Sequence, residues 1–297
     1  MTDRAGSDLT LFQVDAFTTT PFRGNPAAVC LSEAPPPEAT MRAIAAEMNL
    51  SETAFVSPIR SAQTSGEDYY LRWFTPLVEV PLCGHATLAT AKALFEKGFV
   101  SGEIIRFATR SGILSARREG KHIVLDFPQD PPVPAEIPEE VTDALGMSSP
   151  PEEVLFGRDM LMLLLRLPSP EEVKALSPDF PRLSKMRLPY GATGVIVTAP
   201  EKNGNNRSGQ ASFDFVSRYF GPWEGIDEDP VTGSAHTVLG PYWAKRLGKR
   251  RLLAFQASQR GGELHLRLPG DNAPEEAKSR MSIAGEAVIV FSGTFHL

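Results

Sequence analysis

The feature that most constrains the fold of this chain is an internal repeat. Short motifs in the first half recur in the same order in the second half, and the distance between partners grows slowly along the chain. The pairs are TAFVSP (53–58) with VIVTAP (195–200), Phe-x-Pro (74–76) with Phe-x-Pro (220–222), and the helix-opening Gly84 with Gly233. Chance similarity among short apolar strands is the alternative for the first two pairs, but the third favours two copies of one unit with small insertions.

The pattern of apolar residues predicts one mixed fold class. Apolar residues recur at helical spacing in residues 35–49, and residues 84–98 are small or apolar almost all round, so we predict two helices and expect the second to be buried. Stretches rich in β-branched and aromatic residues predict strands at 11–17, 27–31, 51–58, 69–75, 103–107, 113–117 and 122–127. Strands and helices do not alternate strictly, which favours an α+β fold over a doubly wound parallel sheet.

Length and charge limit the number of domains and the partners. The chain has 297 residues, of which 42% are apolar, and this length favours two domains over one core. A proline cluster at residues 127–138 can continue neither a sheet nor a helix, so we place the domain boundary there. The formal net charge is -6, so we expect no nucleic-acid partner.

Cysteine content and hydropathy indicate a cytoplasmic protein. Cys30 and Cys83 are the two cysteines, too few for a disulfide framework or a multi-cysteine metal site. The longest purely apolar run, residues 160–165, is far shorter than the roughly 20 residues that span a membrane. The first residues lack the apolar stretch of a secretory signal. We therefore expect a soluble protein with no membrane partner.

The two helices that begin with glycine are candidate anion sites. The first turn after Gly84 or Gly233 leaves backbone N–H groups unpaired, and such a helix end binds a carboxylate well. If the two halves pack with pseudo-twofold symmetry, both ends face one cleft and hold one small acid. Ser234 can add its hydroxyl and its N–H to this binding. The plainer alternatives are that each glycine only allows a tight turn and that Ser234 is an ordinary helix-start serine.

Three residues close to these helix starts can move protons. His85 lies in the first turn of its helix, where the helix dipole favours a neutral ring. Glu52 begins an otherwise apolar strand, where a carboxylate keeps its proton more readily, and this suits general acid–base catalysis. Asp229 can orient a histidine or the substrate. The structural alternatives are a core histidine, a solvated strand-edge glutamate and a turn-capping aspartate.

Other motifs are weaker or absent. Cys83 directly precedes Gly84, and a helix N-terminus activates a thiol, although most buried cysteines are inert. The sequence has no glycine-rich phosphate loop, no paired-cysteine metal set and no Gly-x-Ser-x-Gly elbow, so we expect no metal. Pro241 follows Gly240 inside the expected second central helix. Because proline removes a hydrogen bond to Thr237, we predict a kink or break there, with residues 242–247 packing separately.

Five motifs follow one another along the chain. They are DAF with GNPA (15–17 and 24–27), NLSET (49–53), FTPLVEVPLCGHAT (74–87), EDPVTGSA (228–235) and QASQRGG (256–262). Together they resemble the PhzF-like phenazine-biosynthesis isomerase family. The resemblance implies a diaminopimelate epimerase-like fold of two similar domains, residues 8–128 and 129–282, each a curved sheet around a central helix, with residues 283–297 returning to the first. It also implies a site in the cleft between the domains, a homodimer and no cofactor.

The same resemblance implies a mechanism. The family activity is similar to isomerisation of trans-2,3-dihydro-3-hydroxyanthranilate, in which a glutamate removes a proton from C3 and returns it to the conjugated system. On this basis Glu52 is the general acid–base, and His85 and Asp229 position the substrate amine and hydroxyl and assist proton movement. The substrate carboxylate is held at the helix ends by Gly84, Gly233 and Ser234.

Two other functions stay open. An epimerase or racemase of a small amino or hydroxy acid uses one cysteine on each side of the reacting carbon. Cys83 stands where the first would be, but the expected partner position holds Pro230 and Val231. Cys83 also departs from the phenazine-pathway enzymes, which leaves the physiological substrate open. A non-catalytic protein that binds a small acid is the third possibility, although it would not need a proton-moving Glu52.

Overall fold

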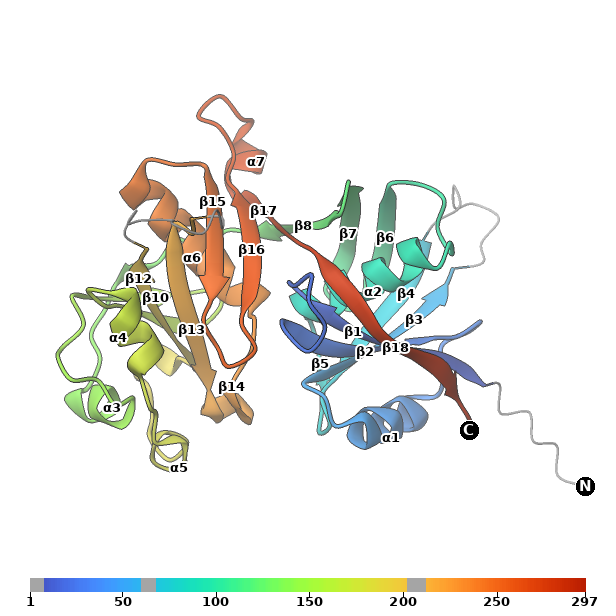
Figure 1. Cartoon of the computed structure of the whole chain (residues 1–297), viewed down its shortest axis with the longest axis horizontal. Helices are drawn as coiled ribbons and strands as arrows, with labels where there is room; N and C mark the ends of the chain where they lie inside the picture. Colours follow the sequence, from blue (N-terminus) through green and yellow to red (C-terminus); the bar gives the residue numbers. More distant parts are fainter. Residues whose placement is uncertain (1–7, 60–67, 202–211) are drawn as a thin grey trace, which may run out of the picture. The chain divides into compact units, whose positions relative to one another are not determined.

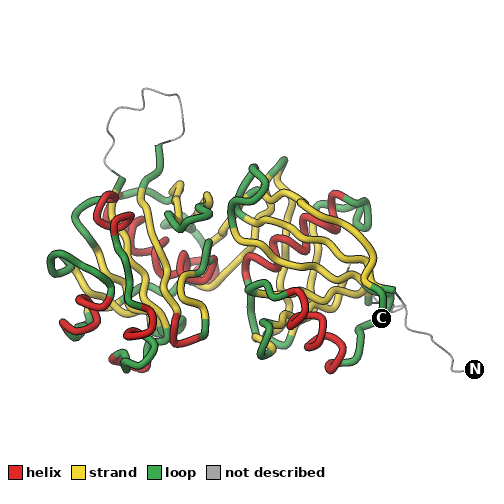
Figure 2. Tube along the Cα trace, turned by 60° about the horizontal axis from the view of Figure 1, so that its bottom comes forward, coloured by secondary structure: helices red, strands yellow, loops and turns green. Residues whose placement is uncertain are grey.

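The chain forms two compact units in the computed structural model, which describes residues 8–59, 68–201 and 212–297 (Figure 1). The first unit contains the described residues up to Asp126 together with Ala284–Leu297, and the second contains Phe127–Ile283. Both units are mixed structures in which strands outnumber helices, as Figure 2 shows. Among the described residues, no helix is long and apolar enough to cross a membrane.

The first unit is built on one sheet. Its strands lie in the order β18 (Ala287–Phe295), β1 (Leu9–Ala16), β2 (Asn25–Leu31), β3 (Glu52–Pro58), β4 (Asp68–Phe74), β6 (Ile104–Thr109), β7 (Gly112–Glu119) and β8 (His122–Pro128). The pairs β2–β3 and β4–β6 are parallel, and the others are antiparallel. The last strand of the chain therefore pairs with the first, as Figure 1 shows.

Helix α2 (Gly84–Glu96) lies in the middle of this unit because it is apolar on almost every side. All residues from His85 to Phe95 are buried except Lys92, which is half-buried. The helix contacts β1, β2, β3, β7 and β18, so the sheet wraps around it. Helix α1 (Glu38–Met48) packs on the same sheet through a separate cluster of apolar side chains, among them Met41, Ile44, Phe55 and Phe74.

The second unit repeats this arrangement. Its strands are β10 (Glu153–Gly157), β11 (Met162–Arg166), β12 (Gly194–Pro200), β13 (Phe215–Gly221), β15 (Arg251–Gln256) and β16 (Gly262–Arg267). Neighbouring strands in this list pair antiparallel or parallel in the same order as β1, β2, β3, β4, β6 and β7 do in the first unit. Helix α6 (Gly233–Leu247) takes the place of α2. The topology thus bears out the repeat, since TAFVSP and VIVTAP lie in β3 and β12 and both Phe-x-Pro motifs begin within the last residues of β4 and β13.

Shorter elements complete the two units. They are β5 (Glu79–Val80), β9 (Val133–Pro134), α3 (Glu139–Ala144), α4 (Pro170–Ala175), α5 (Phe180–Leu183), β14 (Ile226–Glu228), α7 (Glu275–Lys278), β17 (Arg280–Gly285) and two 3-10 turns, Pro189–Gly191 and Pro222–Glu224. The core of the second unit gathers apolar side chains from β11, β12 and β13 with those of α3, α4 and α5.

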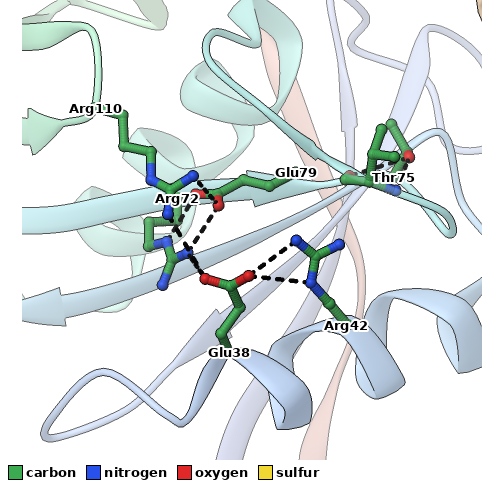
Figure 3. A network of polar contacts seen from close by, with 7 residues as sticks. Glu38, Arg42, Arg72, Thr75, Glu79 and Arg110 are labelled. Atoms are coloured by element: carbon green, nitrogen blue, oxygen red, sulfur yellow. Dashed lines mark hydrogen bonds and ion pairs between the residues drawn. The ribbon is translucent and has the colours of Figure 1, made fainter.

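Arg72 on β4 ties this strand to β5 and to α1 (Figure 3). Its guanidinium forms two bonds to the carboxylate of Glu79, of 2.7 and 2.8 Å, and one of 2.7 Å to Glu38. Hydrogen bonds from Arg72 and Arg42 lower the pKa of Glu38 to about 2. The guanidinium also lies 5.1 Å from the ring centroid of Phe74, a cation–π contact.

The second unit carries the same arrangement on β13. Arg218 forms bonds of 2.7 and 2.9 Å to Glu228 and lies 4.8 Å from the ring centroid of Phe220. It also donates to the carbonyl oxygen of Leu176, at 2.8 Å. These counterparts reveal a longer repeat than the sequence comparison used, because EVPLCG (79–84) aligns without a gap with EDPVTG (228–233).

Helix α6 runs unbroken through Pro241, so the predicted break is wrong. Proline lacks the N–H that would bond to the carbonyl of Thr237. That carbonyl accepts the backbone N–H of Asp130 instead, at 3.1 Å. The residue before the proline is Gly240, which has no Cβ to crowd the proline ring. Residues 242–247 therefore continue the helix and do not pack as a separate turn.

Candidate active site

The start of α2 lacks a side-chain cap from its N-cap residue. Cys83 is the N-cap residue, and its carbonyl oxygen accepts both the backbone N–H and the hydroxyl of Thr87, at 3.2 and 2.6 Å. No side-chain hydrogen bond from the N-cap residue closes this end among the described residues. The N–H groups of the first turn therefore have no acceptor within the helix, and an anion binds favourably there.

Glu52, His85 and Cys83 form a row of contacts at this helix start. Glu52 is the first residue of β3, and its side chain is 12% exposed. Its Oε2 lies 3.2 Å from Nε2 of His85, and Nδ1 of the same ring lies 3.5 Å from Sγ of Cys83. The buried imidazole therefore lies between a carboxylate and a thiol, and its tautomer decides whether Nδ1 donates to or accepts from Sγ.

Ser51 and Asn25 belong to the surroundings of this ring, although the sequence analysis assigned no role to either. Oγ of Ser51 lies 3.5 Å from Nε2 of His85 and donates to Oδ1 of Asn25 at 3.4 Å. Asn25 is fully buried at the start of β2. It follows Gly24, whose φ is positive and whose place admits no side chain, since a Cβ would lie 2.1 Å from the carbonyl oxygen of Ala16.

Glu52, Cys83 and His85 are also donors of the kind that bind zinc, and their ligand-type atoms all lie within 4.8 Å of one another. A metal ion would use a single nitrogen of His85. In this structure the two nitrogens face Glu52 and Cys83 separately. The arrangement therefore suits a chain of proton transfers better than chelation of one ion.

Asp229 and Thr232 form the corresponding start of α6. Thr232 is the N-cap residue of α6, so it holds the place that Cys83 holds in α2. Its hydroxyl donates to Oδ2 of Asp229 at 2.5 Å, and both side chains are buried. The prediction that Pro230 and Val231 hold the counterpart of Cys83 is therefore wrong, because the N-cap position of α6 holds Thr232, a hydroxyl residue.

Gln256 holds the loop that precedes α6. Its Nε2 donates to the main-chain oxygen of Asp229 at 2.7 Å and to Oγ1 of Thr232 at 3.2 Å. Its Oε1 accepts the backbone N–H of Thr232 at 2.8 Å. The hydroxyl of Ser258 donates to the carbonyl oxygen of Pro230 at 2.8 Å. The motif QASQRGG thus fixes this loop, a role that no spacing in the sequence indicated.

His236 belongs to the core of the second unit. Its Nδ1 donates to the carbonyl oxygen of Thr232 at 2.8 Å, as the hydroxyl of Thr87 does to that of Cys83. The ring is fully buried and stacks on Phe215, and burial lowers the pKa of His236 to about 4. His236 is therefore neutral at neutral pH.

The residues expected to form the site divide between the two helix starts. In the first unit Glu52 lies beside His85, and Gly84 opens the helix. In the second unit Asp229 precedes Gly233 and Ser234, which form the first turn of α6. Each group combines side chains that hold protons with first-turn N–H groups that have no acceptor within the helix and attract an anion.

Comparisons with known proteins agree over nearly the whole chain. The family model described as "Phenazine biosynthesis-like protein" (PhzC-PhzF) matches residues 14–293. An uncharacterized isomerase of Pseudomonas aeruginosa is 49% identical over 290 residues, covering 98% of this chain and 100% of that protein. Phenazine biosynthesis-like domain-containing protein 2 of Mus musculus is 44% identical over 297 residues, covering 96% of this chain and 98% of that protein.

Solved structures share the fold. A PhzF family protein of Enterococcus faecalis has a TM-score of 0.84 and 40% identity, with 98% of this chain and 100% of that chain covered. A predicted epimerase of Pseudomonas aeruginosa, 20% identical, matches in fold with a TM-score of 0.65 over 97% of this chain and 99% of that chain. The expected diaminopimelate epimerase-like α+β fold is therefore confirmed.

Proposed function

Because this chain belongs to the PhzC-PhzF family of phenazine biosynthesis-like proteins, we propose that it is a cofactor-independent isomerase that moves a proton within a small carboxylate-bearing substrate. The Pseudomonas aeruginosa relative is named an isomerase, which supports the reaction class. The contact between Glu52 and His85 is the observation that carries the proposal, since it places an ionisable ring 3.2 Å from a buried proton acceptor.

The proposed reaction conserves protons and electrons. The carboxylate of Glu52 removes a proton from one carbon of the substrate, breaking a C–H bond whose electron pair shifts into the conjugated system. The carboxylic acid then returns this proton to another carbon, where a new C–H bond forms. His85 lies 3.2 Å from the carboxylate and keeps it aimed while its charge changes.

The substrate carboxylate is the group that the helix starts would bind. We assign it to the N–H groups of the turns that begin at Gly84 and at Gly233, with the hydroxyl of Ser234 as a further donor. Asp229 is assigned to the substrate amine or hydroxyl. These assignments are supported by the family resemblance and by the places of the residues at the starts of α2 and α6.

Epimerisation or racemisation of a small amino or hydroxy acid is the second candidate, and the position of Cys83 favours it. The thiol lies at a helix N-terminus, 3.5 Å from Nδ1 of His85. The corresponding residue of the second unit, however, is Thr232, whose hydroxyl is a far weaker acid than a thiol. A mechanism that needs two thiols is therefore less well supported than proton transfer by Glu52.

The first experiment uses trans-2,3-dihydro-3-hydroxyanthranilate as its probe. The purified protein is incubated with it in D₂O without cofactor, and ultraviolet absorbance and deuterium incorporation are followed by NMR, beside the variant Glu52→Gln. Turnover with deuterium at a new carbon, lost in the variant, supports the isomerase. Inversion at a single carbon supports the epimerase. Absence of turnover in a folded protein removes this substrate, and small amino and hydroxy acids are then screened in the same way.

The alternative function, a non-catalytic protein that binds a small acid, predicts a different result. Such a protein would keep its affinity for the acid in Glu52→Gln and would show no deuterium exchange in either form.

From the family resemblance we also propose that the protein forms a homodimer, which light scattering tests. A cytoplasmic location is proposed from the cysteine content of the sequence.

A further inference from the structure

The buried amide of Gln256 and the hydroxyl of Thr232 form a chain of hydrogen bonds that ends on the carboxylate of Asp229. The amide nitrogen is a donor, so at 3.2 Å it donates to Oγ1 of Thr232. Because the hydroxyl accepts this bond, its own proton is directed to Oδ2 of Asp229, 2.5 Å away. The amide cannot turn freely, since its oxygen accepts the N–H of Thr232 and its nitrogen also donates to the main-chain oxygen of Asp229.

A helix start of this kind does not require such a chain. Helix α2 begins in the same way, with an extended N-cap residue followed by a glycine. The residue that corresponds to Gln256 is Thr109, because each is the last residue of the strand after the central helix. Thr109 bonds within its own hairpin, to the carbonyl oxygen of Gly112 at 2.7 Å. The hydrogen bonds of the Gln256 amide are thus present in the unit that carries Asp229. A central helix can begin without them.

We propose that Thr232 and Gln256 are positioning residues of the proton-transfer reaction, which hold the carboxylate of Asp229 in one orientation toward the amine or hydroxyl of the substrate. This inference rests on the proposed function of Asp229. It gives the motif QASQRGG a role in the reaction through Gln256. Neither positioning residue has to touch the substrate, because both act through the carboxylate.

The variants for the test separate this role from a structural one. Thr232→Val removes the hydroxyl at nearly constant volume, and Thr232→Ser restores it. Gln256→Met removes the amide and keeps a side chain of similar length. Thr237→Val is the matched control, because Thr237 is a buried threonine of the same helix whose hydroxyl donates to the carbonyl oxygen of Ser234. Crystal structures show the orientation of Asp229, and steady-state kinetics give kcat and KM.

We expect Thr232→Val and Gln256→Met to lower kcat about 100-fold with little change in KM, since misplacing a reacting group has an effect of this size. Their crystal structures should show the Asp229 carboxylate turned from its wild-type orientation. Thr232→Ser should recover most of the activity, and Thr237→Val should resemble the wild type.

The positioning role of Thr232 and Gln256 and the proposed function can fail separately. If Thr232→Val is as active as Thr237→Val while Asp229→Asn is inactive, the positioning role is wrong and the proposed function stands. If the wild type turns over none of the acids tested, the proposed function fails. The crystal structures alone then decide whether Thr232 and Gln256 hold the carboxylate of Asp229 in place. A carboxylate that keeps its place in both Thr232→Val and Gln256→Met then overturns the hydrogen-bond role as well, whereas a displaced carboxylate supports it.

Discussion

Cys83 and Thr232 hold the same position in the two units, each as the N-cap residue of the central helix, yet one carries a thiol and the other a hydroxyl. The thiol faces Nδ1 of His85, whereas the hydroxyl donates to Oδ2 of Asp229. A duplicated fold has therefore become chemically unequal at its two helix starts. The proton transfer proposed for Glu52 uses a single carboxylate and needs no second thiol, whereas exchange between mirror images at one carbon uses one acid–base group on each face.

Replacement of Glu52 by glutamine should abolish proton transfer. The amide has the shape of the carboxylate but cannot accept a proton, so we expect substrate-dependent deuterium exchange to fall about 10²–10⁴-fold. NMR in D₂O measures the rate, and the exposed Glu47 on α1 supplies the control Glu47→Gln. An exchange rate in Glu52→Gln close to that of the wild type would remove Glu52 from the mechanism.

Replacement of Cys83 distinguishes the two candidate reactions. Serine keeps a hydrogen-bonding group beside Nδ1 of His85, so we expect Cys83→Ser to retain isomerase activity within about tenfold of the wild type. Cys30→Ser is the control, since burial raises the pKa of the Cys30 thiol to about 12 and makes it inert. Complete loss of activity in Cys83→Ser, together with inversion at one carbon in the wild type, would favour the epimerase.

The protein should lose stability in mild acid because of His236. Burial lowers the pKa of His236 from 6.5 to about 4, so the unfolded chain binds a proton below pH 6.5 that the folded protein does not bind until about pH 4. Stability is therefore full above pH 6.5 and declines as the pH falls toward 4, by up to about 3 kcal/mol.

Urea unfolding at pH 7 and pH 5 of the wild type and of His236→Thr tests this dependence. Threonine stands at the corresponding place in α2, where the hydroxyl of Thr87 bonds to the N-cap carbonyl. We expect the variant to be less stable at pH 7, because a large buried side chain is lost, but to lose less stability on going to pH 5. An equal loss in both proteins would show that His236 is not responsible.

Arg218 should matter more to stability than its counterpart Arg72. The pair of Arg218 with Glu228 is largely buried, and removal of the cation by Arg218→Met leaves an unpaired carboxylate, which costs about 3 kcal/mol. In Arg72→Met the carboxylate of Glu79 keeps Arg110, at 2.6 Å. Urea unfolding of both variants measures the difference. An equal loss in the two would contradict the explanation, and Arg218→Met combined with Glu228→Gln should recover part of the loss.

Much of the fold was predictable because it depends on local pattern. A helix of small and apolar residues between glycines has to be buried, and α2 is. The repeat predicted a second helix of the same kind at Gly233, which is α6. The break at Pro241 was predicted wrongly because its cause was treated as local. The carbonyl that proline leaves unpaired is satisfied by Asp130, a residue far away in the sequence.

The residues that support the candidate site were not predictable either, because their contacts also join distant parts of the sequence. Ser51 contacts both His85 and Asn25, which are distant from it in the sequence, and Gln256 reaches Thr232 from the end of β15, so sequence spacing contains no sign of these contacts. Thr232 could have been found, however. The gapless alignment of EVPLCG with EDPVTG places it opposite Cys83.

The pairing of β18 with β1 orders events during synthesis of the chain. The second unit is complete in sequence at Ile283, whereas the first unit waits for Ala287–Phe295 to fill the place beside its first strand. A nascent chain therefore carries a finished second unit before it can close the first. A chain without Ala287–Phe295 leaves one edge of β1 without its partner strand, in the same sheet that holds Glu52, so the damage falls on the part of the protein that was made first.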